Sequence, residues 1–207
     1  FWRGLQRLQD EFGISGPALV TFMGDSVAAR LDDEIFWRGL QRLQDEFGIS
    51  GSALVTFMSG SVASRLGDEM IWRGLQRLED EFSLSGSALA SFMSGSVAAR
   101  LDDEIFWRGL QRLQNEFGIS GSALVTFMSD CVALRLGNES FWRGLQRLRD
   151  EFGISGSALV TFMSSSVAVR LDDEMFWRGL QRLQDEFGIS GPALVTFMGD
   201  SVAARLD

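Results

Sequence analysis

Apolar residues recur at helical spacing along the chain, and the pattern returns every 35 residues. Four apolar residues of the second copy are three or four positions apart: Phe36, Leu40, Leu43 and Phe47. Residues at this spacing lie on one face of an α-helix, so the pattern predicts a helix over about 33–47 with one apolar side. The other copies predict the same helix at equivalent positions.

The ends of this helix carry suitable capping residues. Asp32 or Asp33 can accept a hydrogen bond from a free backbone N–H, and Glu34 suits the positive end of the helix dipole. Gly48 can adopt the left-handed conformation that closes a helix. Trp37 lies on the flank of the apolar stripe, which favours a place in the core between repeats over an exposed aromatic strip that stacks on bases or grips a peptide.

A second helix is predicted from Ser15 to about Leu31. Ser15 can cap it, and Pro17 suits its first turn, where a missing N–H costs little. Among the positions of this segment at which the copies differ are 17, 21, 25, 29 and 32. These steps of four and three trace one face of one helix. A break at Gly24–Ser26 is the alternative, but a loop there would not keep the differences in helical phase, so we expect an uninterrupted helix.

Two copies mark the end of this second helix with a glycine. Gly67 and Gly137 are expected to close it in the left-handed conformation. The residues that follow them, Asp68 and Asn138, are expected to cap the next long helix. Each copy is therefore a helical hairpin, and a tight turn links it to the next.

Six such hairpins make up the chain. The repeats are residues 1–35, 36–70, 71–105, 106–140, 141–175 and 176–207. A fixed period of this length is typical of architectures in which each repeat buries its apolar face against its neighbours. We predict one all-α array of tandem αα-hairpin repeats over residues 1–207, an α-solenoid that forms either an open superhelix or a closed ring.

The first and last repeats have no polar cap. Residues 1–32 and 176–207 are identical, and both keep the full apolar pattern. Open arrays normally protect their terminal repeats with polar residues. Three arrangements fit this observation: a slice of a longer array, a closed ring, or ends that stack on other molecules.

Composition and charge exclude several classes of function. The chain has no lysine, histidine or tyrosine, and its 19 arginines face 28 carboxylates, for a net charge of −9. This balance opposes non-specific binding to nucleic acid or to an anionic membrane. The single cysteine, Cys131, permits no disulfide within the chain. No signal-peptide pattern and no membrane-spanning stretch occur, so we expect a cytoplasmic protein.

Catalysis has few groups to use in this composition. Aspartate and glutamate recur in every repeat, so none is distinguished as a general acid or a metal ligand. The cluster of Asp32, Asp33 and Glu34 is explained by the start of a helix. Zinc, Walker-A and dinucleotide-binding motifs are absent. The sequence therefore predicts no enzyme, no metal site and no cofactor.

The 25th and 29th positions of each repeat form the candidate ligand face. Modular binding proteins keep a constant framework and change a few positions per repeat to recognise a ligand. Drift on a solvent-exposed face produces the same pattern, so both explanations stay open. The residues are Asp25, Gly60, Gly95, Asp130, Ser165 and Asp200, together with Ala29, Ser64, Ala99, Leu134, Val169 and Ala204.

Two sets of charged residues are expected to act between repeats. The first is a candidate inter-repeat ladder: Arg30, Arg65, Arg100, Arg135, Arg170 and Arg205. Such an arginine could grip carboxylates or phosphates of a ligand, but a cation whose stem packs on apolar neighbours and whose head pairs with a carboxylate is favoured. The second set lies on the long helix, where Glu34 is expected to pair with Arg38 and Arg42 with Glu46.

The place of the 25th position resembles the TAL-effector type of DNA-binding repeat. In that family two adjacent variable residues per repeat select a base, and Asp25, Gly60 and Asp130 occupy a similar place between LVTFM-like and VA-like segments. The resemblance implies a modular nucleic-acid reader. The chain lacks the family's glycine pair with a following lysine or glutamine, so we assign no family.

These observations together favour a non-enzymatic helical-repeat scaffold. Its expected partners are a protein or peptide ligand, or copies of itself joined through the uncapped ends. The alternative is a nucleic-acid-binding repeat that reads bases through the 25th position. Nucleic acid is not the expected partner because the chain is acidic, and no membrane partner is expected.

Overall fold

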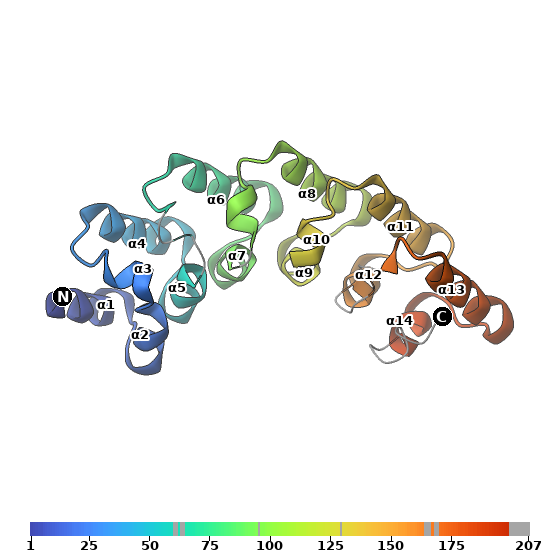
Figure 1. Cartoon of the computed structure of the whole chain (residues 1–207), viewed down its shortest axis with the longest axis horizontal. Helices are drawn as coiled ribbons and strands as arrows, with labels where there is room; N and C mark the ends of the chain where they lie inside the picture. The colour runs from blue at the N-terminus through green and yellow to red at the C-terminus, as the bar shows by residue number, and fades with distance from the viewer. Residues whose placement is uncertain are drawn as a thin grey trace. The chain divides into compact units, whose positions relative to one another are not determined.

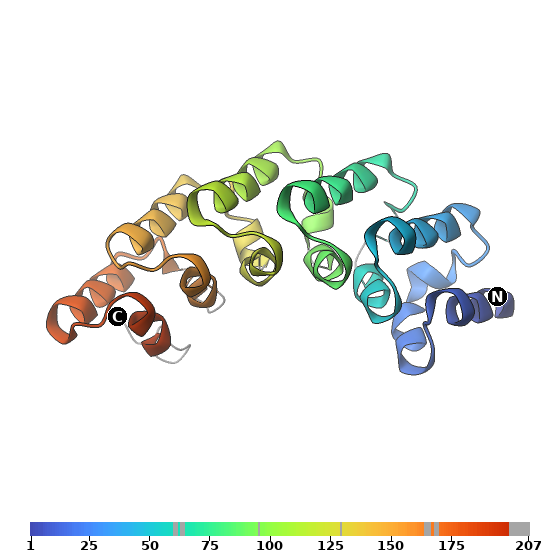
Figure 2. The same cartoon turned by 180° about the vertical axis from the view of Figure 1, so that it is seen from behind.

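The computed structural model describes residues 1–59, 62, 65–94, 96–128, 130–163, 167 and 170–198. These residues form helices and turns and no strand, which confirms the predicted all-α repeat of helical hairpins. The chain divides into two compact halves, Phe1–Asp103 and Glu104–Asp207, and each half contains three hairpins (Figures 1 and 2). One continuous array over the whole chain stays a prediction.

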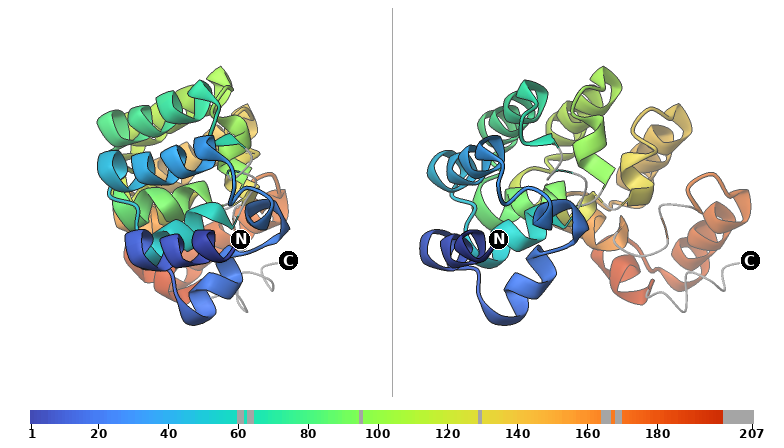
Figure 3. Two further views of the ribbon diagram at one scale, coloured as in Figure 1. Left: turned by 90° about the vertical axis from the view of Figure 1, so that its left-hand side faces the viewer. Right: turned by 60° about the vertical axis from the view of Figure 1, so that its left-hand side comes forward.

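In the N-terminal half, long helices alternate with short ones. The helices are α1 (Trp2–Phe12), α2 (Gly16–Phe22), α3 (Asp25–Ala28), α4 (Glu34–Phe47), α5 (Gly51–Met58), α6 (Glu69–Phe82), α7 (Gly86–Met93) and the 3-10 helix η2 (Ser96–Arg100). The long helices α1, α4 and α6 lie side by side in one layer (Figure 3). The short helices form a second layer, in which α5 packs against both α2 and α7.

The C-terminal half repeats this arrangement. Its helices are α8 (Glu104–Phe117), α9 (Gly121–Phe127), α10 (Asp130–Ala133), α11 (Glu139–Asp150), α12 (Gly156–Met163), α13 (Glu174–Phe187) and α14 (Gly191–Phe197). The short helix α12 packs against both α9 and α14. None of the helices in the described part of the chain is long and apolar enough to cross a membrane.

The long helices form where the apolar period predicts them. At the start of α4, the Asp33 carboxylate accepts a hydrogen bond from the Ile35 N–H at 2.9 Å. At its end, Gly48 takes the left-handed conformation with φ 65° and closes the helix. Leu40 and Leu43 on the apolar stripe are fully buried. The prediction of a helix over about 33–47 is therefore confirmed.

The second helix of the hairpin is shorter than predicted. In the first repeat, the expected helix from Ser15 to Leu31 is replaced by α2, a turn at Met23 and Gly24, and α3. Gly24 is extended, with φ −56° and ψ 162°, and Ser15 lies at the N-cap position without a side-chain hydrogen bond. The prediction of an uninterrupted helix is wrong, and the fourth repeat has the same break between α9 and α10.

The break returns the chain to the beginning of its own long helix. Gly4 lies eight residues before Phe12 in α1, which is about 12 Å along a helix. An unbroken helix from Gly16 would carry Leu31 about 22 Å from its start and past Gly4. With the break, the Cβ of Leu31 lies 3.1 Å from where a Cβ on Gly4 would be. The packing of Leu31 on Gly4 therefore requires the helix to break, even though an unbroken helix would place the varying positions on one face.

The two glycines expected to close the second helix do not do so. Gly67 and Gly137 lie in the turn before the next long helix and are not left-handed. The residues after them cap that helix as predicted. Asp68 and Asn138 each accept a hydrogen bond, at 2.9 Å, from the backbone N–H two residues later. The link between hairpins is therefore fixed by the cap and not by a left-handed glycine.

Each long helix carries a glycine where the end of its hairpin presses against it. A Cβ on Gly39 would lie 3.0 Å from the Cβ of Leu66, and a Cβ on Gly109 would lie 2.8 Å from the Cβ of Leu136. These distances leave no room for a side chain. The glycine is present in all six repeats, so it sets how closely the returning chain approaches the helix.

We predict that Gly109→Ala lowers the free energy of unfolding by up to about 2 kcal/mol. Overpacking costs about 1–3 kcal/mol, and it exceeds the gain of about 1 kcal/mol from replacing glycine in a helix. Urea unfolding followed by circular dichroism measures the change. Adding Leu136→Ala as the second arm of a double-mutant cycle should show a coupling between the two sites. An alanine variant that is more stable than the wild type would contradict this account.

Candidate functional site

A tryptophan at the start of the long helix fills the boundary between consecutive repeats. Trp37 of α4 is buried, and its indole N–H donates a hydrogen bond to the Leu31 carbonyl at 2.8 Å. Its ring stacks on Phe12 with the centroids 6.1 Å apart, and the guanidinium carbon of Arg7 lies 4.5 Å from its centroid. Both partners belong to α1 of the preceding repeat. Trp37 is therefore a core residue, as predicted.

This contact, which we call the aromatic boundary contact, recurs at three more boundaries within the halves. It joins Trp72 with Phe47 and Arg42, Trp142 with Phe117 and Arg112, and Trp177 with Phe152 and Arg147. The guanidinium carbons lie 4.4–4.6 Å from the indole centroids, within the range of a cation–π interaction. The predicted Arg42–Glu46 ion pair forms at 2.8 Å. The expected Glu34–Arg38 pair does not occur in the described part of the chain.

We predict that Trp72→Phe lowers the free energy of unfolding by about 1–3 kcal/mol. The phenyl ring keeps the stacking but leaves the buried Leu66 carbonyl without its donor at 3.1 Å, and an unpaired buried group costs about that much. Trp2→Phe is the matched control, because Trp2 is exposed and should shift stability by at most about 0.5 kcal/mol. Chemical denaturation of both variants checks this. Equal effects would show that the indole N–H contributes nothing at the boundary.

A cleft opens beside each aromatic boundary contact, between one long helix and the next. The four clefts have volumes of about 250–420 Å³. We call them the arginine clefts, because two arginines of one long helix line each of them. Between α4 and α6 these are Arg38 and Arg42, which share the lining with Gly39, Leu66 and Trp72.

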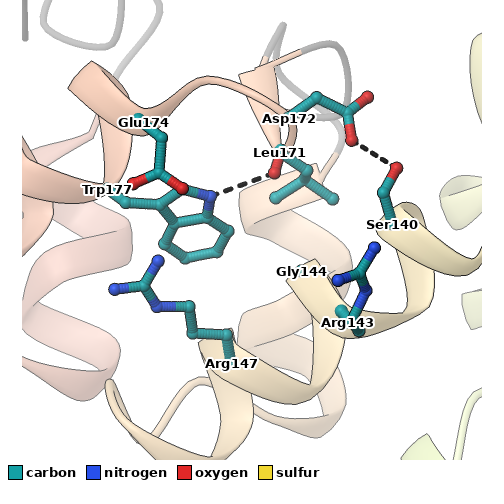
Figure 4. A pocket seen from close by; sticks show the side chains of 8 residues that line it. All are labelled: Ser140, Arg143, Gly144, Arg147, Leu171, Asp172, Glu174 and Trp177. Carbon is teal, nitrogen blue, oxygen red and sulfur yellow. Dashed lines mark hydrogen bonds between the residues drawn. The ribbon is translucent and has the colours of Figure 1, made fainter.

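Figure 4 shows the arginine cleft between α11 and α13. Arg147 lies against the ring of Trp177, whose indole N–H bonds to the backbone behind it. On the other side of the cleft, the Ser140 hydroxyl donates a hydrogen bond to the Asp172 carboxylate. This bond, followed by those from the Arg135 guanidinium, lowers the pKa of Asp172. The carboxylate therefore stays ionised at neutral pH.

The charge of the clefts differs because one varying position lines all of them. This 32nd position of the repeat is Asp32 or Asp172 in two clefts and Gly67 or Gly137 in the other two. The glycine clefts lack that carboxylate. Arg38 is exposed in one of them, and no carboxylate among the described residues forms an ion pair with it.

Most arginines of the predicted inter-repeat ladder pair within their own hairpin. Each of these guanidinium groups lies near the carboxylate three residues later, which accounts for an arginine among apolar residues. The pairs are Arg30–Asp33 at 3.4 Å, Arg65–Asp68 at 3.1 Å, Arg100–Asp103 at 3.7 Å and Arg170–Asp173 at 3.1 Å. Arg205 lies outside the described residues.

Two arginines of the ladder contact the following repeat. The cap residue after Arg135 is the uncharged Asn138, and the guanidinium reaches instead to Asp172 of the next repeat at 2.9 Å. Arg65 keeps its local pair and also donates to the Ala98 carbonyl of the next repeat at 2.6 Å. Arg65 and Arg135 therefore each join two consecutive repeats.

Hydrogen bonds lower the pKa of two capping carboxylates. For Asp68 the main cause is the backbone N–H of Met70, followed by the Arg65 side chain. For Asp173 the main cause is the hydrogen bond from Arg170. Because the folded-state pKa lies below the ordinary value of 3.8, each carboxylate stabilises the fold above that pH. This contribution is lost as the pH falls through the folded-state pKa.

We predict that Asp68→Asn is less stable than the wild type at pH 6 and that the difference shrinks as the pH falls below the ordinary aspartate pKa of 3.8. Asparagine keeps the cap, as Asn138 does, but it has no charge to pair with Arg65. Urea unfolding across this pH range measures the difference. Asn138→Asp is the reciprocal variant and should add stability at pH 6 that is lost on acidification. A difference between Asp68→Asn and the wild type that does not change with pH would contradict the assignment.

The structure brings the 25th and 29th positions together at the two ends of a short helix. Asp25 begins α3 and Asp130 begins α10. Ala29, Ala99 and Leu134 are exposed. The other members of the candidate ligand face lie outside the described residues: Gly60, Gly95, Ser165, Asp200, Ser64, Val169 and Ala204.

The remaining positions of the predicted varying face, the 17th, 21st and 32nd of the repeat, are exposed in every copy that the structure describes. In the first repeat these are Pro17 and Thr21 on α2 and Asp32 after α3. The constant residues Phe22 and Val27 of the same segment are buried. This face of the segment is therefore solvent-exposed, whereas the changes at Leu84 and Ala90 lie in the core.

Neither a metal centre nor a related protein defines this site further. Among the described residues, no group of three or more cysteine, aspartate or glutamate side chains is arranged to hold a metal ion. Comparisons of the chain with protein-family models, with curated proteins and with solved structures find no significant match. The geometry alone places the protein in the class of helical-hairpin repeats.

Periodicity did not reveal the arginine clefts, because they depend on how one long helix lies against the next. A signal was nevertheless present in Gly39 and its equivalents. Glycine inside a helix costs about 1 kcal/mol relative to alanine, yet all six repeats keep it. A glycine retained at this cost indicates a close approach of another chain segment, here Leu66.

Proposed function

We propose that the protein is a non-enzymatic helical-repeat scaffold that binds a protein or peptide ligand through the candidate ligand face. One observation carries the proposal: the 17th, 21st, 29th and 32nd positions of the repeat differ among copies and are exposed in every copy that the structure describes. A repeat of this design can change its contacts without changing its fold. The arginine clefts and the ladder then serve to hold consecutive repeats in register.

Leu134 is the strongest single contact site on this face. Its side chain is 65% exposed, and the equivalent residues in the described repeats are alanines, Ala29 and Ala99. Burying a leucine side chain contributes about 1.5–3 kcal/mol. An exposed leucine beside polar surface is therefore a suitable anchor for an apolar side chain of a ligand.

We predict that Leu134→Ala weakens ligand binding about tenfold without changing the fold. The probe is a peptide selected on the wild-type protein from a random display library, and fluorescence anisotropy measures its affinity. Alanine is the residue that other repeats already carry at this position. Ile35→Ala is the control, because Ile35 is an apolar side chain of similar exposure on a long helix. Equal loss in both variants would show that the selected peptide does not use this face.

The same titration separates the nucleic-acid alternative. Duplex DNA and single-stranded RNA are added at low salt in place of the peptide. The proposal expects no binding, because the acidic chain repels phosphates. Binding that falls steeply with salt, and that changes with base sequence when Asp130 or Gly60 is exchanged, would replace the protein-ligand proposal with a nucleic-acid reader.

A second candidate function is assembly with copies of itself. The observation that favours it is that each aromatic boundary contact is completed by residues of two consecutive repeats, as Trp37 is by Phe12 and Arg7. A repeat of a second copy has the same residues and can supply one side of such a contact.

A further inference from the structure

Two of the arginine clefts carry a positive charge that the residues lining them do not balance. These are the glycine clefts, which lie between α4 and α6 and between α8 and α11, and two arginines and one glutamate line each of them. The cleft between α11 and α13 has two arginines, one glutamate and Asp172, so its charges cancel. Each glycine cleft therefore has a net charge of +1 in a chain whose net charge is −9.

The two arginines of a glycine cleft differ in what holds them. Arg42 pairs with the glutamate four residues later at 2.8 Å and lies against the Trp72 ring, so it belongs to the aromatic boundary contact. Arg38, one turn earlier on α4, is exposed, as is its equivalent Arg108, which donates from Nε to the Glu104 carbonyl at 3.4 Å. No carboxylate in the described part of the chain forms an ion pair with either of them. The charge open to a ligand thus comes from Arg38 and Arg108.

The cleft between α11 and α13 shows that a carboxylate fits in this place (Figure 4). Asp172 holds the position that glycine has in the other two clefts. Its carboxylate accepts hydrogen bonds from the Ser140 hydroxyl and, at 2.9 Å, from the Arg135 guanidinium. The chain thus supplies its own carboxylate to this cleft and supplies none to the glycine clefts at that position.

In the glycine clefts, an apolar side chain stands where the other cleft has its serine. A Cβ on Gly67 would lie 3.3 Å from the Cγ2 of Ile35, and a Cβ on Gly137 would lie 3.1 Å from the Cγ2 of Ile105. An aspartate has little room beside either isoleucine. Ile35 is 53% exposed and Ile105 is 49% exposed. Each glycine cleft therefore presents an exposed arginine together with an open apolar side chain.

We propose that each glycine cleft binds one acidic side chain of a peptide through its exposed arginine, Arg38 or Arg108, while the isoleucine contacts an apolar neighbour in that peptide. A guanidinium binds a carboxylate through two parallel N–H···O hydrogen bonds. The volumes of about 310 and 370 Å³ are at the lower limit of ligand pockets and suit one side chain. The site uses no residue of the candidate ligand face, so it goes beyond the proposed function.

The charge of the glycine clefts favours a carboxylate over a phosphate. One carboxylate balances the net charge of +1 in each cleft. A phosphate group carries a charge of about −1.5 to −2 at neutral pH. It would leave an excess of negative charge beside the glutamate that lines the cleft, in a chain that is already acidic.

The chain itself provides the design of a closed cleft. Ile35→Ser with Gly67→Asp copies the Ser140–Asp172 pair into the cleft between α4 and α6, and Ile105→Ser with Gly137→Asp copies it into the cleft between α8 and α11. The new carboxylate then competes with the peptide for the arginine. We call the chain with all four changes the closed variant. Each serine removes the methyl group that would crowd the aspartate, and circular dichroism verifies that the variant folds.

Two further variants separate the cleft from the overall charge. Arg38→Gln with Arg108→Gln removes the two proposed cations. Arg178→Gln with Arg182→Gln is the matched control, because both arginines are exposed on α13 and line none of the four clefts. These two variants and the closed variant all have the same net charge.

The probe is a peptide selected on the wild-type protein from a random library displayed through its C-terminus, so that side chains are the only carboxylates offered. Selected peptides are expected to carry an acidic residue beside an apolar one. Fluorescence anisotropy of a labelled peptide should show binding about tenfold weaker in the closed variant and in Arg38→Gln with Arg108→Gln, as expected for the loss of a hydrogen bond to a charged group. The α13 control should bind like the wild type.

A change in the peptide tests whether its acidic side chain meets these arginines. Replacing the acidic residue by its amide should weaken binding to the wild type about tenfold. The same replacement should change nothing in Arg38→Gln with Arg108→Gln, because the partner is already absent. A coupling of this kind distinguishes a direct contact from a general effect of the variant on the fold.

Four results would overturn the proposal. Selection may yield no peptide with an acidic residue, or the α13 control may lose as much affinity as the cleft variants, which would assign the effect to overall charge. A peptide with phosphoserine at the acidic position that binds more tightly than the acidic peptide would make the ligand a phosphate. Peptides weakened by Leu134→Ala but not by the closed variant would remove this site and leave the candidate ligand face intact.

Discussion

At each boundary described within the halves, a buried tryptophan takes its partners from the repeat before it. Trp37 needs the Leu31 carbonyl, the Phe12 ring and the Arg7 guanidinium, and none of these belongs to its own helix. A repeat alone would expose the indole and leave a carbonyl unpaired, so its stability depends on its neighbour. The rest of the array follows from this dependence, because the long helices must lie side by side for the contact to form.

The dependence between neighbours also decides which residues are constant and which vary. Helix caps, the apolar stripe, the glycine of the long helix and the aromatic boundary contact all act in packing, and they recur in nearly every repeat. The 17th, 21st, 29th and 32nd positions are exposed wherever they are described, so packing places little demand on them. Changes in the core, such as Ile71, Leu84 and Ala90, keep an apolar residue.

The sequence predicted the long helices because their signals are local. Asp33, the apolar stripe and Gly48 lie within one helix, and the structure agrees with each of them. The interruption of the second helix was missed because its cause is not local: Leu31 must reach Gly4, which is far away in the sequence. The arginine clefts were missed for the same reason, since Arg38 and Trp72 meet only when two repeats are packed. The pairing of Arg135 with Asp172 likewise depends on a neighbouring repeat.

Asn138 changes the partner of one ladder arginine. In most described repeats the ladder arginine stabilises its own hairpin through the aspartate three residues later. With Asn138, the same guanidinium binds Asp172 instead, so its contribution moves from one repeat to the interface between two. In a nearest-neighbour description of unfolding, the free energy of this ion pair then counts toward the interface between two repeats and no longer toward the stability of one repeat. The substitution at this helix cap thus replaces an ion pair within one repeat by an ion pair between the fourth and fifth repeats.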